Sequence, residues 1–280
     1  MRLHFVVNRR VPPRPSPVLL EVFDLLVRAG HEVIDGIPEE TLVRPDVLRP
    51  EGDLYVVKSH TELAFSLAGA LHAAGARQLN PYPSWAATQD KLVTSRYLRM
   101  AGIPAPRSWL TADLSLLAPV VETRPLIVKP HRGHRGAGVQ LARTPGELAA
   151  LHVGDQPVIV QEHVPGPGED LKVYVVGEEV FAVRKVFSAT SFAVAGRPCA
   201  VDAELCDIAR RCGRALGLGL YGLDVIESPD GPVVVDVNTF PGYKGVPRPA
   251  PLIADYITAF ARGEVTLPAP GAAAHAELVA

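Results

Sequence analysis

The stretch LYGLDVIESPDGPVVVDVNTFPGYKG, residues 220–245, decides the fold. Two apolar runs, at residues 221–226 and 232–237, flank the sequence Ser-Pro-Asp-Gly. Asp-Gly readily adopts the backbone angles of a tight hairpin turn. The pattern therefore predicts two antiparallel strands joined at residues 228–231.

Three side chains with oxygen donors lie in this hairpin. Asp224 lies inside the first apolar run, and Asp236 and Asn238 close the second. Residues two apart in a strand share a face, so Asp236 and Asn238 point the same way. A register that aims Asp224 at them gives a site that suits hydrated Mg²⁺ together with phosphate oxygens. The alternative, three solvated residues at strand ends, is disfavoured because an unpaired carboxylate is costly within an apolar run.

A second motif is a strand-end lysine before a glycine-rich loop. Residues 126–129 (LIVK) predict a buried strand, and HRGHRGAGV follows Lys129 and Pro130. Glycines let backbone N–H groups approach phosphate oxygens, and the lysine offsets their charge. The order differs from a P-loop, in which the lysine follows the glycines. For His131 and His134, hydrogen bonding or solvation is favoured over a metal site.

Together these motifs resemble the ATP-grasp superfamily, and the likeness spans residues 80–245. The hairpin is similar to the metal-binding end of RimK-like amino-acid ligases and of inositol polyphosphate kinases with the same fold. RimK-like ligases usually carry Glu where this chain has Asp236, whereas the inositol kinases carry Asp. The resemblance implies that Asp224, Asp236 and Asn238 hold Mg²⁺ on the phosphates of ATP, with two ions during turnover.

The same resemblance implies a set of nucleotide contacts. Backbone groups of residues 162–164 pair with the adenine edge. Asp170, or Glu169 as second choice, holds the ribose hydroxyls, since a carboxylate can accept two hydrogen bonds. The implied ATP-binding residues are Lys91, Lys129, Gly133, Gly136, Gly138, Glu162, His163, Val164, Asp170 and Lys172.

Basic residues near the transferred phosphoryl group are the implied catalytic residues. Lys172 matches a lysine of the inositol kinases and an arginine of the RimK-like ligases. Arg184 and Lys185 end the next predicted strand, and we expect one of them to face the transferred group. The implied catalytic set is Lys129, Lys172, Arg184 and Lys185. A solvated strand face remains the alternative for Lys172, Arg184 and Lys185.

The first part of the chain alternates strands and helices, which predicts a small α/β domain with a parallel sheet. It has no GxGxxG after the first strand, so the dinucleotide fingerprint is absent. Lys58 and His60 end the third predicted strand, where open α/β sheets place ligands. They and Arg9, in a loop with Arg10 and Arg14, are candidate substrate contacts. Solvated loop and strand-end residues are the alternative.

The predicted fold class is α/β, with α+β character in the ATP-binding part. It is an ATP-grasp fold, in which an N-terminal parallel α/β domain precedes two α+β subdomains that sandwich ATP. The expected boundaries are 1–83, 84–163, 164–264 and a tail, 265–280, that is disordered or loosely packed. Ser84 is the expected N-cap of a helix that runs to residue 100.

Composition limits the function classes. The chain has 280 residues, 48% of them hydrophobic, and a net charge of −2, so no basic field favours nucleic acid. Its three cysteines lack metal-ligand spacing and predict free thiols in a reducing cytoplasm. No signal peptide or membrane span is expected. The expected partner is a small-molecule or peptide substrate, without nucleic acid or membrane, and a homodimer is an open alternative.

Three functions stay open. An ADP-forming carboxylate–amine ligase is favoured, because the loop after Lys129 is RimK-like and Val139 replaces a histidine of the kinases. A small-molecule kinase is supported by Asp236, Lys172 and Lys58. One feature departs from the ligase pattern: the Arg-x-Asn segment usual in RimK-like ligases is missing from residues 187–198. Ser188, Thr190 or Ser191 are the candidates to make its contacts instead. A nucleotide-binding regulatory protein is the third alternative.

Overall fold

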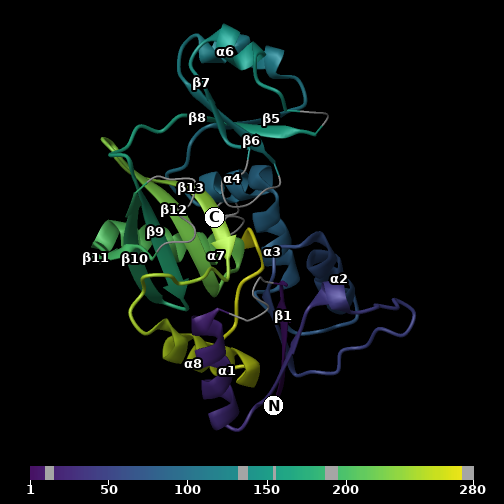
Figure 1. Ribbon diagram of the computed structural model, residues 1–280. Coiled ribbons are helices and arrows are strands. Elements are labelled where there is room, and N and C mark those ends of the chain that lie inside the picture. Colours follow the sequence, from purple (N-terminus) through teal and green to yellow (C-terminus); the bar gives the residue numbers. More distant parts are fainter. Residues whose placement is uncertain (10–15, 132–137, 154–155, 187–194, 273–280) are drawn as a thin grey trace.

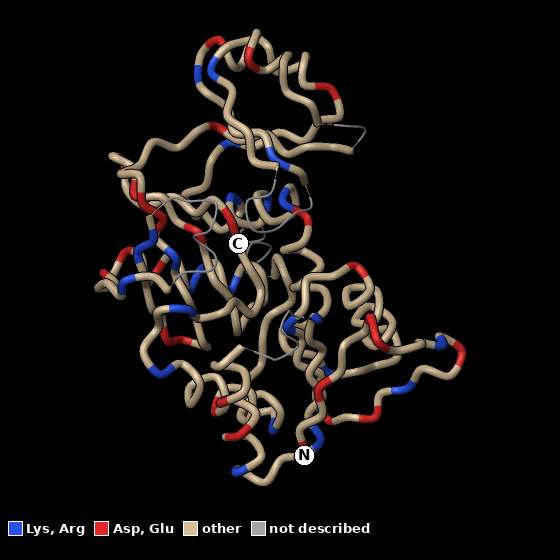
Figure 2. The backbone as a smooth tube through the Cα atoms, in the orientation of Figure 1, with Lys and Arg blue, Asp and Glu red and all other residues tan. Residues whose placement is uncertain are grey.

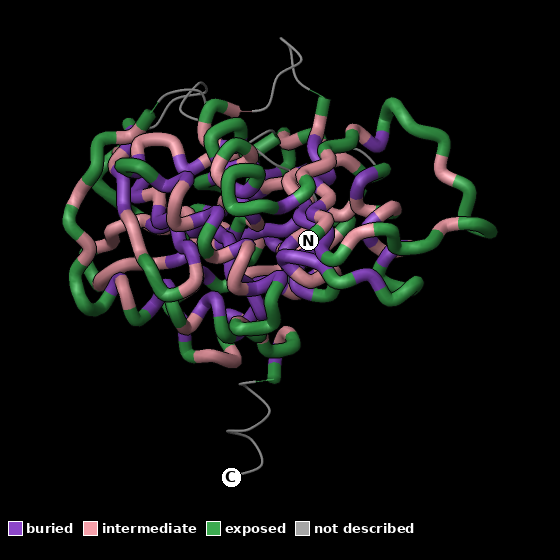
Figure 3. Tube along the Cα trace, turned by 90° about the horizontal axis from the view of Figure 1, so that it is seen from below, coloured by how far each residue is buried: buried purple, intermediate pink, exposed green. Residues whose placement is uncertain are grey.

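The computed structural model describes residues 1–9, 16–131, 138–153, 156–186 and 195–272. Three sheets form three lobes (Figure 1). Buried segments run through the interior of these lobes, and the loops around them are exposed (Figure 3). In the described residues no helix is both long and apolar enough to cross a membrane.

The N-terminal lobe contains a four-stranded parallel sheet with the order β2-β1-β3-β4, as predicted. Its strands are β1 (Arg2–Val7), β2 (Glu32–Gly36), β3 (Leu54–Lys58) and β4 (Gln78–Leu79). Side chains of α1 (Pro17–Arg28) and α8 (Pro249–Arg262) pack against one face, and those of α2 (Glu62–Ala73) and α3 (Tyr82–Gln89) pack against the other. A 3₁₀ turn, η1 (Pro38–Glu40), follows β2.

The small upper lobe in Figure 1 is an antiparallel sheet with the order β5-β8-β6-β7. Its strands are β5 (Ser108–Thr111), β6 (Leu126–Pro130), β7 (Gln140–Ala142) and β8 (Val158–Glu162). The elements η2 (Leu114–Leu117), α5 (Ala118–Val121) and α6 (Pro145–Ala149) cover one face with an apolar cluster.

The third lobe is a five-stranded antiparallel sheet with the order β11-β10-β9-β12-β13. Its strands are β9 (Glu169–Val176), β10 (Glu179–Val186), β11 (Arg197–Cys199), β12 (Leu220–Ser228) and β13 (Gly231–Thr239). The predicted hairpin is thus confirmed as β12 and β13. The helix α7 (Ala203–Leu216) packs its apolar stripe on one face of this sheet.

One predicted helix is two helices. The chain forms α3 and then α4 (Lys91–Met100), which meet at Asp90. Asp90 Oδ1 accepts hydrogen bonds from the N–H groups of Leu92 at 2.9 Å and Val93 at 3.2 Å, so it starts a new helix. Ser84 is fully buried inside α3, and its expected role as an N-cap is wrong.

The tail is packed as far as the structure describes it. Val265 and Leu267 lie against the core beside α8. Gly271 is buried against Tyr97, and its N–H donates to Ala215 O at 2.8 Å. The expectation of a loose tail is therefore wrong for residues 265–272, because apolar side chains and one backbone bond hold them in place.

The distribution of charged residues agrees with the nearly balanced numbers of basic and acidic residues in the sequence. Along the described chain, Lys, Arg, Asp and Glu are interspersed in all three lobes (Figure 2). Cys199, Cys206 and Cys212 are all free, as predicted, and Cys212 is buried.

Candidate functional site

One face of the five-stranded sheet gathers predicted site residues from several segments of the sequence. Asp224 lies directly opposite Asp236 on β13 and opposite Lys172 on β9. Asp170, two residues before Lys172, lies opposite Lys185 on β10. Directly opposed residues in an antiparallel pair share a face. The register thus brings these five side chains from four strands to one face, hereafter the charged face.

Lys172 links two of the carboxylates. Its Nζ lies 2.9 Å from Asp170 Oδ2 and 3.0 Å from Asp224 Oδ2. Burial opposes the charged form of Lys172, but the attraction of Asp224 and Asp170 outweighs it and raises the pKa of the lysine. Burial raises the pKa of Asp224, and Lys172 limits that rise. The site therefore holds charges that are stabilised by one another more than by water.

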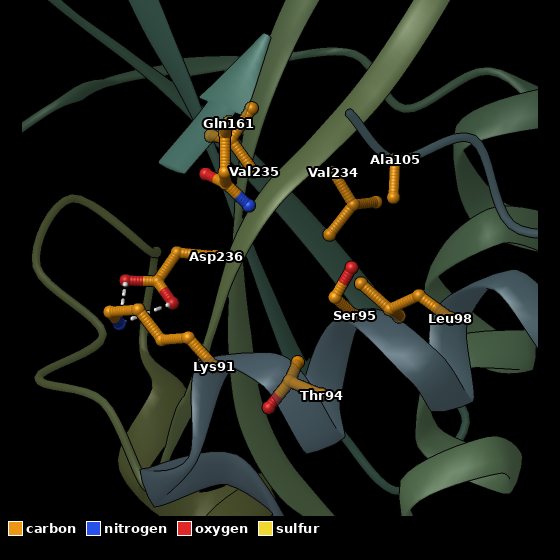
Figure 4. A pocket seen from close by; sticks show the side chains of 9 residues that line it. All are labelled: Lys91, Thr94, Ser95, Leu98, Ala105, Gln161, Val234, Val235 and Asp236. Carbon is orange, nitrogen blue, oxygen red and sulfur yellow. Dashed lines mark hydrogen bonds and ion pairs between the residues drawn. The ribbon is translucent and has the colours of Figure 1, made fainter. Parts of the chain in front are cut away.

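A second lysine reaches the sheet from the neighbouring helix. Lys91 is the first residue of α4, and its Nζ lies 3.0 Å from Asp236 Oδ1 and 3.2 Å from Oδ2 (Figure 4). The helix start fixed by Asp90 aims this lysine at β13. In the sequence Asp90-Lys91, the first residue therefore caps α4 and the second brings its ammonium group to the Asp236 carboxylate.

Lys129 comes from the small upper sheet. It lies near the end of β6, and its Nζ donates to Val235 O at 3.3 Å. Burial lowers the pKa of Lys129 and nearby Lys91 adds to this, while Asp236 and Asp224 oppose it. Lysines from two separate elements thus converge on the carboxylates of β12 and β13.

The donor set at the hairpin fits Mg²⁺. Asp224, Asp236 and Asn238 offer two carboxylates and one amide, and Gly222 lies opposite Asn238. No three His, Cys, Asp or Glu side chains form a metal-binding group within the described parts of the chain. Mg²⁺ usually takes one or two protein carboxylates and completes its shell with water and phosphate oxygens. The metal assignment stays a prediction.

A pocket lies where α4, β8 and β13 meet (Figure 4). Lys91 and Asp236 close one end of it, and Gln161 of β8 lines another wall. The Gln161 side chain donates to Ser108 Oγ at 3.2 Å. Gln161 directly precedes the predicted adenine-binding segment, and Asp236 belongs to the predicted metal site, so the pocket has a residue next to each of the two.

The backbone of the predicted adenine segment is partly used within the upper sheet. The N–H of Glu162 donates to Arg107 O at 3.0 Å, and that of His163 donates to Pro125 O at 2.9 Å. Within the described residues, the N–H of Val164 has no backbone acceptor. Val164 is therefore the donor that fits the predicted role, and the Glu162 carboxylate instead pairs with Arg124 at 2.5 Å.

Arg184 is separated from the other predicted catalytic residues. Neighbouring residues of a strand point to opposite faces, and Lys185 shares the face of Asp170. Arg184 lies on the other face, where its Nη2 lies 2.7 Å from Glu227 Oε1. Of the two candidates, Lys185 is therefore the one that lies on the face of the other site residues, and a catalytic role for either residue stays a prediction. Burial lowers the pKa of Lys185, and nearby Lys172 and Lys244 add to this, whereas Asp224 opposes it.

The candidate substrate residues lie on the N-terminal lobe. The Nζ of Lys58 lies 2.5 Å from Phe240 O, and the Nε of Arg9 lies 3.1 Å from Glu40 Oε1. His60 is half-buried two residues beyond the end of β3. These contacts do not test a substrate role, which stays a prediction.

Several predicted residues belong to the glycine loop and its neighbours. Gly138 has a φ of +73°, and a Cβ there would lie 3.0 Å from Pro130, so glycine suits this position. His131 Nδ1 lies 3.1 Å from Pro157 O, which confirms the expected hydrogen bonding. The predicted residues outside the described ranges are Arg10, Arg14, Gly133, His134, Gly136, Ser188, Thr190 and Ser191.

Two further residues, Tyr174 and Lys244, lie near this face and were not among the predicted site residues. Tyr174 lies opposite Gly222, on the face of Lys172, and burial with nearby Asp224 raises its pKa to about 12. The alternation in KVYVVG placed Tyr174 beside Lys172 and could have indicated it. Lys244 lies near enough to lower the pKa of Lys185, and its place after FPGY was the available signal.

The family model and the relatives that match this chain agree with one another. The model of the RimK-like ATP-grasp domain matches residues 88–254. A probable alpha-L-glutamate ligase of Xanthomonas campestris pv. campestris is 34% identical over 186 residues, which cover 60% of this chain and 62% of that protein. A ribosomal protein bS6–L-glutamate ligase of Escherichia fergusonii is 30% identical over 190 residues, covering 62% and 63%.

The fold agrees with solved structures. A RimK domain ATP-grasp protein from Sphaerobacter thermophilus superposes with a TM-score of 0.73 at 21% identity, covering 92% of this chain and all of that one. This likeness confirms the predicted ATP-grasp fold. The chain spans about three fifths of the length of the first curated relatives that it matches.

Proposed function

The chain belongs to the RimK-like ATP-grasp family, and from that premise we propose that it is an ADP-forming ligase that joins a carboxylate to an amine. One observation carries the proposal: lysines from α4 and β6 meet the carboxylates of Asp224 and Asp236 on one sheet face. A magnesium-bound triphosphate is a ligand that needs cations and carboxylates side by side.

The residues of the site would bind ATP in parts. The N–H of Val164 would pair with adenine, and the Asp170 carboxylate would accept the ribose hydroxyls. Asp224, Asp236 and Asn238 would hold Mg²⁺, and the bound ion would supply positive charge that neutralises the phosphates during transfer. Lys91 and Lys172, which pair with Asp236 and Asp224 here, would instead donate to phosphate oxygens.

The proposed reaction has two steps. A carboxylate oxygen of the substrate attacks the γ-phosphorus, the bond to the β,γ-bridging oxygen breaks, and ADP leaves with that electron pair. The amine nitrogen then attacks the acyl carbon, phosphate leaves, and the nitrogen loses a proton. Lys91, Lys129 and Lys185 would supply positive charge around the transferred group, and no protein side chain forms a covalent bond.

The substrates are proposed from the named relatives. Two of them are called L-glutamate ligases, one acting on ribosomal protein bS6. We therefore take an amino acid as the amine, with L-glutamate as the first to test. The carboxylate would belong to a small molecule or a peptide.

The test follows both products of ATP. The chain is incubated with ATP, Mg²⁺, an amino-acid pool and candidate carboxylates, and free ADP and phosphate are measured. A ligase releases both, and hydroxylamine traps the acyl phosphate as a hydroxamate. A kinase releases ADP but leaves the phosphate on its product. A regulatory binder releases neither, although MgATP still raises its melting temperature. The Lys129→Met variant is the control for contaminating activity.

A further inference from the structure

A lysine of the N-terminal lobe holds the turn that follows the metal-binding strand. Lys58 ends β3, and its Nζ lies 2.5 Å from Phe240 O and 2.8 Å from Pro241 O. The same Nζ lies 4.5 Å from the centroid of the Phe240 ring. An ammonium group offers three donors, so it can serve both carbonyls at once. This contact joins residues that are 182 positions apart in the sequence.

The neighbouring strand β4 holds the other half of the hairpin. Asn80, directly after β4, donates from Nδ2 to Leu220 O at 2.7 Å, and its Oδ1 accepts from the N–H of Gly219 at 2.8 Å. Phe240 N also donates to Leu220 O at 2.7 Å. Lys58 at the end of β3 thus holds the turn after β13, and Asn80 after β4 holds the start of β12 beside it.

The turn held by Lys58 is strained. Phe240 has a φ of +36° and Tyr243 a φ of +50°, a region that residues with a Cβ rarely adopt. Such conformations persist only where the surroundings determine them. Both side chains are buried, and Tyr243 Oη donates to Val175 O at 2.8 Å. The turn therefore depends on external contacts, and Lys58 provides two of them.

We propose that Lys58 is a positioning residue for the metal site. By binding the carbonyls of Phe240 and Pro241, it fixes the backbone on which Asn238 lies two residues earlier. The inference rests on the proposed function, in which Asn238 is a ligand of Mg²⁺. This positioning role is an alternative to the direct substrate contact predicted for Lys58 from its place at a strand end. Through this lysine the position of the N-terminal lobe is coupled to the geometry of the metal ligands.

The test compares Lys58→Met, which keeps the length but loses the charge, with Lys58→Arg, which keeps the donors. Arg44→Met is the matched control, since Arg44 is an exposed cation of the same lobe paired with Asp46 at 2.6 Å. ADP binding is titrated with Mg²⁺ and in EDTA. We expect Lys58→Met to weaken apparent Mg²⁺ affinity about tenfold, as loss of outer-sphere partners typically does. ADP affinity in EDTA should not change, and Lys58→Arg should recover most of the loss.

Hydrogen exchange gives a second readout that needs no ligand. The Phe240 amide should exchange about tenfold faster in Lys58→Met, while amides of β6 keep the wild-type rate. The inference would be overturned if Lys58→Met kept the wild-type Mg²⁺ dependence of ADP binding and the wild-type exchange rate of the Phe240 amide. A variant in which only the KM for the carboxylate substrate is raised would overturn it too. If the wild-type chain shows no Mg²⁺-dependent nucleotide binding, the proposed function fails and this inference fails with it.

Discussion

The two faces of the five-stranded sheet are built from the same strands and differ in composition and environment. Leu171, Val173 and Leu223 lie on one face, where each is at most 4% exposed beneath α7. Lys172 and Asp224 lie on the other, where their charged groups pair with each other and side-chain exposures are 19% and 28%.

Apolar burial stabilises the α7 face, at about 25 cal/mol per Å² removed from water. The charged face gives less stability, since desolvation offsets much of the attraction between buried ions. Strand alternation thus separates residues that maintain the fold from residues available for chemistry. Substitutions on the two faces should accordingly affect different properties, and the following predictions use that difference.

Lys129→Met should lower activity by about 10²–10³-fold, the effect of removing one preorganised charge at a transferred group. It should also raise the melting temperature of the ligand-free chain. The lowered pKa of Lys129 means that its charged form is disfavoured in the folded state, and methionine has no charge to bury. Steady-state rates and thermal unfolding check both parts. A variant that loses stability along with activity would show that Lys129 belongs with the structural residues.

Leu223→Ala tests the apolar face. Leu223 is 1% exposed, and the truncation should reduce the free energy of unfolding by about 3 kcal/mol. The kcat of the folded fraction should stay within about twofold, because the side chain points away from the charged face. Urea unfolding and active-site titration measure the two quantities. A large fall in kcat at full folding would remove the separation between the faces.

Adjacent residues on β10 give a sharper comparison. Lys185→Met should lower activity about 100-fold, at the low end of the range for removing one preorganised charge. Arg184→Met removes a charge one residue away but on the other face, and it should change activity less than about threefold. Rates of the two variants at equal concentration of folded protein are compared. Equal losses would mean that the assignment of faces does not predict function.

The smallest effect is the pH dependence of stability at Asp224. Burial raises its pKa in the folded state, so its protonation stabilises the fold at low pH, and this contribution is lost as pH rises through the raised value. Asp224→Asn cannot ionise. Between roughly pH 4, near the unfolded pKa of aspartate, and pH 7, the variant should gain stability relative to wild type. Urea unfolding across this range should show a growing difference, and a constant or shrinking one would refute the shift.

Much of the charged face could be predicted from sequence. Asp-Gly at the turn and alternation in two apolar runs determine which residues of the hairpin share a face, so Asp224 and Asp236 met as expected. Local patterns carry this information because the side-chain period of a strand is two residues. The order of the lysine, glycine and acidic motifs then indicated the family.

Other features depend on contacts that a linear pattern does not contain. Lys58 meets Phe240 only when two lobes pack together, and nothing around residue 58 indicates its partner. Choosing between Arg184 and Lys185 required the register of β9 and β10. The packed segment 265–272 was missed because an Ala- and Pro-rich composition usually accompanies disorder, whereas Tyr97 and Ala215 offer it a specific surface here.

A crystal structure with ADP and Mg²⁺ tests the charged face most directly. We predict Mg²⁺ about 2.1 Å from oxygens of Asp236 and Asn238, with the ammonium group of Lys91 moved from Asp236 to a phosphate oxygen. Nucleotide bound elsewhere, with the Lys91–Asp236 and Lys172–Asp224 pairs intact, would refute the assignment of this face to ATP.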